Sequence, residues 1–254
     1  MLDTAYKRAT VGGPLHMPSD CTSCPPERLK QYLCAPTVLL VENRNIDGTF
    51  LVHAAKQLTP RISRQLSTAQ HVDVRHAGGN GEMPREVAAL GRQYARYWIP
   101  GLPPRVLAVT DSDAKQPGAE SRYARAVRIA AETAGVDVHV LQMRTIENYV
   151  PDEAVRAYGY RFRDSLPAAE TITSLQPPAR DFYPMKAGLP SDADVSEESE
   201  GLFPPGIGRK LGMGDRFMAG VNSTLLHLVD RTPLRERDHA SDLASLVDKI
   251  EGNL

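Results

Sequence analysis

The stretch Val106-Leu-Ala-Val-Thr-Asp-Ser-Asp113 is an apolar run that stops at two aspartates. Short apolar runs of this kind are typical of buried strands in a parallel sheet. Alternate residues of a strand point to the same face, so the spacing predicts that Asp111 and Asp113 leave the strand side by side. Ligand sites in open α/β sheets gather at this carboxyl edge. The pair is therefore a candidate for binding a divalent ion, although aspartates also end strands by turning the chain or capping the next helix.

Strands and helices alternate on both sides of this stretch. The apolar patterns predict strands over residues 37–42, 71–75, 105–110 and 136–141, and helices over residues 50–58, 84–97, 123–134 and 243–250. Gly135 is the expected stop of the third helix. This alternation implies right-handed βαβ units. The expected fold class is α/β, with a Rossmann-like, mostly parallel four-stranded sheet flanked by helices.

Three regions follow from the distribution of periodic and irregular sequence. Residues 1–36 are rich in Pro and Gly and predict an irregular N-terminal arm, and residues 37–160 predict the α/β core. Residues 161–254 predict a C-terminal extension with a long loop and a terminal helix. Because residues 163–220 show no clear period, we expect a functional or mobile loop there that covers the site edge.

The composition is that of an ordinary globular protein. The chain has 254 residues, 41% of them hydrophobic, and a formal net charge of −1, so a polyanion would have to be held by a local patch. We see no run long enough for a transmembrane helix and no signal-peptide pattern. Three cysteines, an odd number, argue against a secreted disulfide framework. We therefore expect a cytoplasmic protein without a membrane partner.

Three chemically notable features end three of the predicted strands. These are Glu42, the turn at Gly78 and Gly79, and the pair Asp111 and Asp113. In a parallel sheet all three lie on one edge, where the carboxylates could share a metal ion. Such a site could activate water and stabilise the departing oxygen of a phosphodiester, while the glycines admit a close backbone. Alternatively, Glu42 is a surface residue and the glycines form only a turn.

The order of these motifs resembles the TOPRIM domain of topoisomerases, bacterial primases, ribosomal-RNA maturases and OLD-type nucleases. That domain has a glutamate after its first strand and an Asp-x-Asp after its third, which bind Mg²⁺ or Mn²⁺. The segment Arg144-Thr-Ile-Glu-Asn-Tyr149 is similar to an Arg-x-x-Glu-Asn-Tyr element of OLD-like proteins and their relatives in phage-defence operons. The resemblance covers residues 37–155, under half of the chain.

This resemblance implies a metal-dependent endonuclease that acts on DNA or RNA. Asp111 and Asp113 would ligate Mg²⁺ or Mn²⁺, and Glu42 would be a further ligand or the base that activates water. The chain has no G-x-x-x-x-G-K-[ST] motif, so a defence effector of this kind would work with a separate ATPase. A homo-oligomer is also compatible with the sequence.

Three further residues extend the candidate site, each with an alternative. OLD-type proteins commonly have Glu-Gly and then Asp after the first strand; here Asp47 is the candidate second acid, or else the N-cap of the following helix. Glu147 is either a metal-linked acid or the partner of Arg144 across one helical turn. Lys186 resembles an auxiliary lysine of TOPRIM nucleases, although an exposed loop lysine is equally compatible with the sequence.

Cationic and flexible positions suggest contacts to a nucleic-acid backbone. Candidates are Gly78, Gly79, Arg122, Arg209 and Lys210. Arg122 begins a row of arginines on the predicted helix after Asp113, but solvated helix faces commonly look the same. The Gly-x-Gly before Arg209 and Lys210 could also be a plain turn.

The N-terminal region contains a second cluster with metal-ligand chemistry. Cys21 and Cys24 have zinc-knuckle spacing, and Cys34 with His16 would complete a Cys₃His set for structural Zn²⁺. Free thiols in a loop are the favoured alternative.

Two other function classes remain open from the sequence. One is a phosphatase-like phosphotransferase in which an aspartate attacks phosphate. The other is a catalytically silent TOPRIM scaffold that keeps the sheet but binds no metal.

Overall fold

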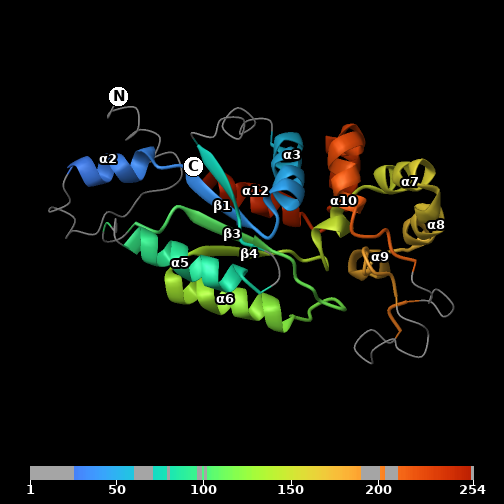
Figure 1. Cartoon of the computed structure of the whole chain (residues 1–254), viewed down its shortest axis with the longest axis horizontal. Coiled ribbons are helices and arrows are strands. Elements are labelled where there is room, and N and C mark those ends of the chain that lie inside the picture. The colour runs from blue at the N-terminus through green and yellow to red at the C-terminus, as the bar shows by residue number, and fades with distance from the viewer. Residues whose placement is uncertain are drawn as a thin grey trace.

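The computed structural model describes residues 26–59, 71–78, 81–95, 99, 102–189, 201–203 and 211–252. Its centre is a four-stranded sheet with every neighbouring pair parallel. The strands are β1 (Thr37–Val41), β2 (Val72–His76), β3 (Val106–Thr110) and β4 (Asp137–Val140), in the order β2-β1-β3-β4 (Figure 1). The expected α/β class with a parallel sheet is therefore confirmed.

Helices cover both faces of this sheet. On one face lie α3 (Thr49–Leu58) and α12 (Asp242–Gly252), and on the other α5 (Met83–Ala95) and α6 (Arg122–Ala134) (Figure 1). Alternate residues of β1 and β3 enter different hydrophobic clusters: Leu39 packs on the α3 side and Leu40 on the α5 side. Because both faces are buried, these strands read as continuous apolar runs.

Specific residues set the ends of α6 and its packing against α5. The Ser121 side chain accepts a hydrogen bond from Ala124 N at the start of α6, and Gly135 ends the helix with φ 63°. Gly91 of α5 packs against Ala134, where an added Cβ would lie 2.5 Å from the alanine Cβ. None of the described helices is both long and apolar enough to cross a membrane.

The part after β4 is more helical than the sequence pattern predicts. It contains a 3-10 turn (Ile146–Tyr149), α7 (Asp152–Arg161), a 3-10 turn (Arg163–Ser165), α8 (Leu166–Ser174), α9 (Ala179–Phe182), α10 (Phe217–Gly220), a π turn (Val221–Leu225), a 3-10 turn (Leu226–Leu228) and α11 (Arg231–Arg237). These elements share the hydrophobic cluster on the α3 side of the sheet. Most of them are short or bury few large apolar side chains: α8 buries only Ala168, Ala169 and Ile172.

The N-terminal arm is not irregular throughout. Residues Pro26–Cys34 form helix α2, which begins at a proline, as helices often do. No residue of α2 is buried, and its apolar stripe of Leu29, Tyr32 and Leu33 is short. Arg105 fixes the end of the helix by donating hydrogen bonds to the carbonyl oxygens of Tyr32 and Leu33.

Candidate functional site

The strand order places the carboxyl ends of β1 and β3 next to each other. The chain goes from β1 to β2 on one side and then crosses to β3 on the other, which makes this point the topological switch of the sheet. Leu40 pairs with Ala108, so continuing the register by two residues sets Glu42 opposite Thr110. The Thr110 hydroxyl donates to Glu42 Oε1 at 3.4 Å. Glu42 thus lies beside the segment that carries the two aspartates.

The end of β2 borders Glu42 on its other side. Ala77 N donates to Val41 O at 2.9 Å, and Gly78 follows with φ 98°, a conformation that favours glycine. Gly78 therefore lies at the sheet edge where the sequence predicts it. Gly79 lies outside the described residues.

The spacing predicts that Asp111 and Asp113 leave strand β3 side by side. In the structure both residues lie after the end of the strand. Strand β3 ends at Thr110, and the chain turns at once because Ser112 points inward and donates to Met143 O at 2.7 Å. Asp111 Oδ1 accepts from Ile146 N at 2.9 Å, whereas Asp113 is exposed and has φ 48°. Positive φ is uncommon for residues other than glycine, and Asp is among those that tolerate it. Both carboxylates interact electrostatically with Glu42 and with each other.

Asp47 is not the N-cap of the following helix. It lies in a π turn (Arg44–Gly48), and α3 begins after Gly48 without a side-chain cap. Asp47 Oδ2 instead accepts from Asn43 N at 2.8 Å, which closes the turn after Glu42. Its carboxylate interacts electrostatically with Glu147 and Glu42. Asp47 thus belongs to the acidic group while it also shapes the local backbone.

Glu147 and Lys186 meet although they are far apart in sequence. Glu147 is fully buried, and Lys186 Nζ lies 3.0 Å from its Oε1 with the lysine side chain half exposed. Neither oxygen of Glu147 accepts a well-formed hydrogen bond within the described part of the chain. A buried carboxylate with so few donors is costly, and a nearby cation lowers that cost.

Arg144 does not pair with Glu147 across a helical turn. Thr145 between them has extended backbone (φ −142°, ψ 168°), so the two residues are not on one helix. Arg144 instead interacts with Asp113, and its Nη1 lies 3.5 Å from Phe182 O. The arginine therefore stands at the exposed end of the acidic group.

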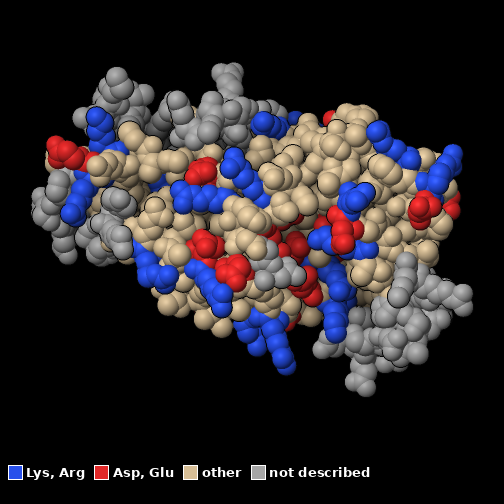
Figure 2. Space-filling view, viewed as in Figure 1, with Lys and Arg blue, Asp and Glu red and all other residues tan. Residues whose placement is uncertain are grey.

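We name the five carboxylates of Glu42, Asp47, Asp111, Asp113 and Glu147 the acidic cluster. Burial raises the pKa of Glu42, Asp47, Asp111 and Asp113, and repulsion between cluster members raises each further; the pKa of Asp47 reaches about 7. Burial alone would lower the pKa of Lys186, but the carboxylates, Glu147 foremost, raise it. Figure 2 shows acidic side chains in a hollow near the middle of the molecular surface that it draws, with basic side chains around the hollow.

The donor set of the cluster fits a hard divalent cation. All five side chains offer oxygen ligands, and their mutual repulsion is what such an ion relieves. In their present positions, however, no three His, Cys, Asp or Glu side chains of the described residues lie close enough to hold one ion. Binding would therefore require side-chain rearrangement, which the exposed Asp113 and half-buried Glu42 allow.

The other predicted residues divide into those at the surface and those outside the described part. Arg122 is exposed at the start of α6. Two later arginines of that helix, Arg125 and Arg128, pair with Glu120. Cys34 is an exposed free cysteine at the end of α2. Arg209, Lys210, Cys21, Cys24 and His16 lie outside the described residues. The predicted contacts of Arg209 and Lys210 with a nucleic-acid backbone and the predicted zinc site therefore stay predictions.

One neighbour of the cluster carries no motif in the sequence. Tyr123, in the first turn of α6, places its buried hydroxyl near Glu42, and burial together with this carboxylate raises the tyrosine pKa. The residue reads in sequence as part of an apolar helix stripe. Only the packing of α6 under the ends of β1 and β3 brings it to the site.

The chain matches no family model, no curated protein and no solved structure. Its function must therefore be inferred from the fold and from the chemistry of the cluster.

Proposed function

We propose that the chain is a metal-dependent nuclease that hydrolyses nucleic-acid phosphodiesters at the acidic cluster, as its resemblance to TOPRIM nucleases implies. The observation that carries the proposal is the gathering of five carboxylates at the switch point of the sheet, with Lys186 against the fully buried Glu147. Ligand sites of open α/β sheets lie at such points. An excess of carboxylates there favours a cation and, through it, a phosphate ligand.

The residues of the cluster have separate roles in this proposal. Glu42, Asp111 and Asp113 would hold Mg²⁺ or Mn²⁺, with Asp47 and Glu147 as further acids near the ion. When bound, the ion would polarise the phosphate and lower the pKa of a water molecule. Glu42 is suited to accept a proton from the attacking water, because burial and Asp113 raise its pKa above the usual value of a glutamate. Lys186 and Arg144 supply positive charge for the phosphate oxygens.

The test is a nuclease assay with Mg²⁺ or Mn²⁺ on DNA and on tRNA. Glu42→Gln and Asp111→Asn keep the side-chain shapes and remove the charges, so we expect each to reduce cleavage at least about a hundredfold. Glu153→Gln, which changes an exposed acid of α7, is the matched control and should cleave like the unmodified protein. Cleavage that survives both cluster substitutions would refute the site.

A catalytically silent scaffold is the competing proposal, and one observation favours it: no three ligand side chains in the described chain converge on one point. Absence of cleavage on every substrate, also with candidate ATPase partners added, together with no divalent-ion binding, would support the scaffold. A phosphatase-like mechanism fits less well. Its nucleophile would be an aspartate, yet Asp111 is largely buried with one oxygen engaged by Ile146 N.

A biological role also follows from the resemblance rather than from a residue. We propose that the chain acts as a cytoplasmic effector in a phage-defence system, together with a separate ATPase. Co-purification of a nucleotide-dependent partner that changes the cleavage rate is the measurement that checks it.

A further inference from the structure

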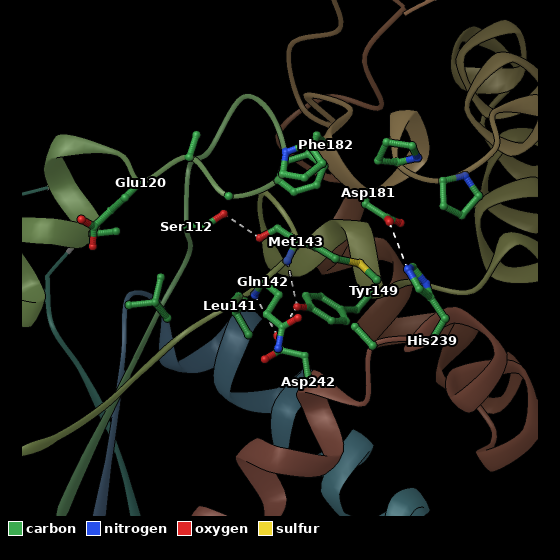
Figure 3. Close-up of a pocket in the computed structure, with 18 of the residues that line it drawn as sticks. Ser112, Glu120, Leu141, Gln142, Met143, Tyr149, Asp181, Phe182, His239 and Asp242 are labelled. Atoms are coloured by element: carbon green, nitrogen blue, oxygen red, sulfur yellow. Dashed lines mark hydrogen bonds and ion pairs between the residues drawn. The ribbon is translucent and has the colours of Figure 1, made fainter. Parts of the chain in front are cut away.

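A cleft of about 1000 Å³ opens beside the acidic cluster. One wall is formed by the start of α6 and the loop before it, and the other by the segment around α9 together with His239. Figure 3 shows Glu120 on one side of the cleft, and Asp181 with His239 on the other. Its volume is at the upper end of the range of small-molecule sites, roughly 300–1000 Å³.

The two walls differ in chemistry. The α9 side presents the exposed rings of Pro177 and Pro178, with the buried Phe182 behind them. The α6 side presents the exposed guanidinium groups of Arg125 and Arg128, which share one carboxylate, Glu120, and so leave a net positive charge on this wall. A ligand with an apolar ring and an anionic group matches this arrangement, because a ring packs on prolines while guanidinium groups bind phosphate.

The cleft lies close to the acidic cluster, although none of the five cluster residues lines it. Ser112, which lines the cleft, lies between the two cluster residues Asp111 and Asp113. Arg144 connects the two places: it interacts with Asp113, while its Nη1 reaches Phe182 O and its backbone N donates to Asp181 O at 3.0 Å. A phosphate beside Arg144 would thus have the cluster on one side and the cleft on the other.

We propose that the cleft binds an unpaired nucleotide of the substrate strand, adjacent to the phosphate that faces the acidic cluster. The inference rests on the proposed nuclease function and specifies its substrate: a single strand, a loop or a flipped-out nucleotide. A base inside a duplex is stacked and paired, so it cannot enter a cleft without being extruded. The ring surface around Pro177 and Pro178 is of no use to an intact duplex, which presents its phosphates outward.

Fluorescence anisotropy in EDTA at low ionic strength tests the proposal without cleavage. The probes are a fluorescein-labelled eight-residue oligothymidylate and a duplex of the same length. We expect the single strand to bind at least about tenfold more tightly than the duplex. Pro177→Ala, which changes an exposed residue of the cleft, should weaken this binding about threefold or more through lost packing on the ring. Arg125→Gln/Arg128→Gln should weaken it about tenfold and, being exposed, should not disturb folding.

The control is Arg163→Gln, an exposed arginine outside the cleft lining, which should bind like the unmodified protein. Equal or tighter binding of the duplex would overturn the inference, as would cleft variants that bind normally. ATP is added as a competitor: if it binds as tightly as the oligonucleotide, the cleft holds a free nucleotide and the inference fails.

The two proposals can fail separately. Cleavage that requires Glu42 but is unchanged in the cleft variants would overturn the cleft inference and leave the nuclease standing. Single-strand binding that requires the cleft, without cleavage under any condition, would support the cleft and refute the nuclease.

Discussion

At the scale of single residues, the ion pair between Glu147 and Lys186 governs the metal-free site. Glu147 is fully buried, and its oxygens accept no well-formed hydrogen bond in the described chain, so the lysine is its main compensation. Removing the ammonium leaves a buried charge without a partner. This destabilises a protein more than replacing both members of a buried pair by apolar residues. The lysine therefore has a structural role even before any substrate is present.

Lys186→Met tests this role, since it removes the charge and keeps an apolar stem. We expect the free energy of unfolding in EDTA to fall by about 1–3 kcal/mol, less than the roughly 3–5 kcal/mol of a fully buried pair because Lys186 is half exposed. Adding Glu147→Gln should recover most of that loss, because the buried charge is gone. Urea denaturation of the two single variants and the double variant measures the coupling. Additive effects would contradict the ion-pair role.

The raised pKa of Asp47 predicts how the stability of the metal-free protein depends on pH. This pKa is raised from 3.8 to about 7 by burial and by neighbouring carboxylates. Between these two values the folded protein binds a proton that the unfolded chain has lost. The stability contributed by this proton is complete below pH 3.8 and disappears as the pH rises through about 7.

Asp47→Asn should flatten this dependence. The amide oxygen can still accept from Asn43 N, while the titrating charge is gone. We expect the variant to be more stable than the unmodified protein at pH 8 in EDTA, with a smaller difference at pH 5. Urea midpoints at pH 5, 6, 7 and 8 check this, and parallel curves for the two proteins would contradict it.

At the scale of elements, two segments of the C-terminal part hold Lys186 in place. Met213 N donates to Met185 O at 2.7 Å, and Gly214 N donates to Lys186 O at 3.1 Å. Tyr183 adds a hydrogen bond from its hydroxyl to Leu211 O. Gly212 lies so close that an added Cβ would fall 2.1 Å from Lys186 O. Only glycine allows this approach.

Gly212→Ala should consequently displace the segment that carries Lys186. Overpacking against backbone costs about 1–3 kcal/mol, and the two amide hydrogen bonds beside it should weaken. Hydrogen exchange of residues 183–189 and 211–214 should become faster. Gly252→Ala is the control, because an added Cβ meets nothing there, and its exchange should be unchanged. Unaltered exchange in Gly212→Ala would show that the contact does not position the lysine.

The elements also show what a sequence can predict. Strands β1 and β3 were predictable because each is a continuous apolar run buried between two covered faces. Helices α3, α5, α6 and α12 were predictable because each buries a periodic apolar stripe. Glu42, Gly78 and Asp111 at one edge followed from parallel strands alone. Strand alternation does not set the directions of the two aspartates, because β3 ends at Thr110 and Asp113 has φ 48°. Of the two alternatives for Glu147, pairing with Arg144 across a helical turn is excluded because Thr145 is extended.

Long-range packing explains what the sequence could not show. The meeting of Glu147 with Lys186 depends on short helices and loops after β4 that have no period. The resemblance to TOPRIM nucleases suggested both residues but not their contact. The cleft was invisible for the same reason, since its walls come from α6, the segment around α9 and the residues before α12.

At the scale of the whole molecule, the acidic cluster combines residues at the ends of sheet strands with Glu147, which contacts Lys186 of the C-terminal part. Figure 1 shows the C-terminal helices beside the sheet. Asp242, at the start of α12, connects this helix to β4 and to the segment that follows it. Its carboxylate accepts a hydrogen bond from Gln142 N at 2.9 Å, lies 3.0 Å from His139 Nε2 and contacts the Tyr149 hydroxyl. The proposed ligands, from residue 42 to residue 147, come together only in the folded chain. An ion held by them should therefore stabilise the entire fold rather than one loop.

Thermal unfolding with and without Mn²⁺ tests this linkage independently of nuclease activity. At an ion concentration one hundred times the Kd, binding contributes about 2.7 kcal/mol, which for a chain of this size raises Tm by roughly 5–10 °C. Glu42→Gln and Asp111→Asn should lose most of that increase. In EDTA both should melt at or above the unmodified protein, because each removes one of the repelling carboxylates. Glu153→Gln should show the full increase. An equal Mn²⁺ effect in all four proteins would place the ion elsewhere, and no effect in any of them would remove the metal from the proposed function.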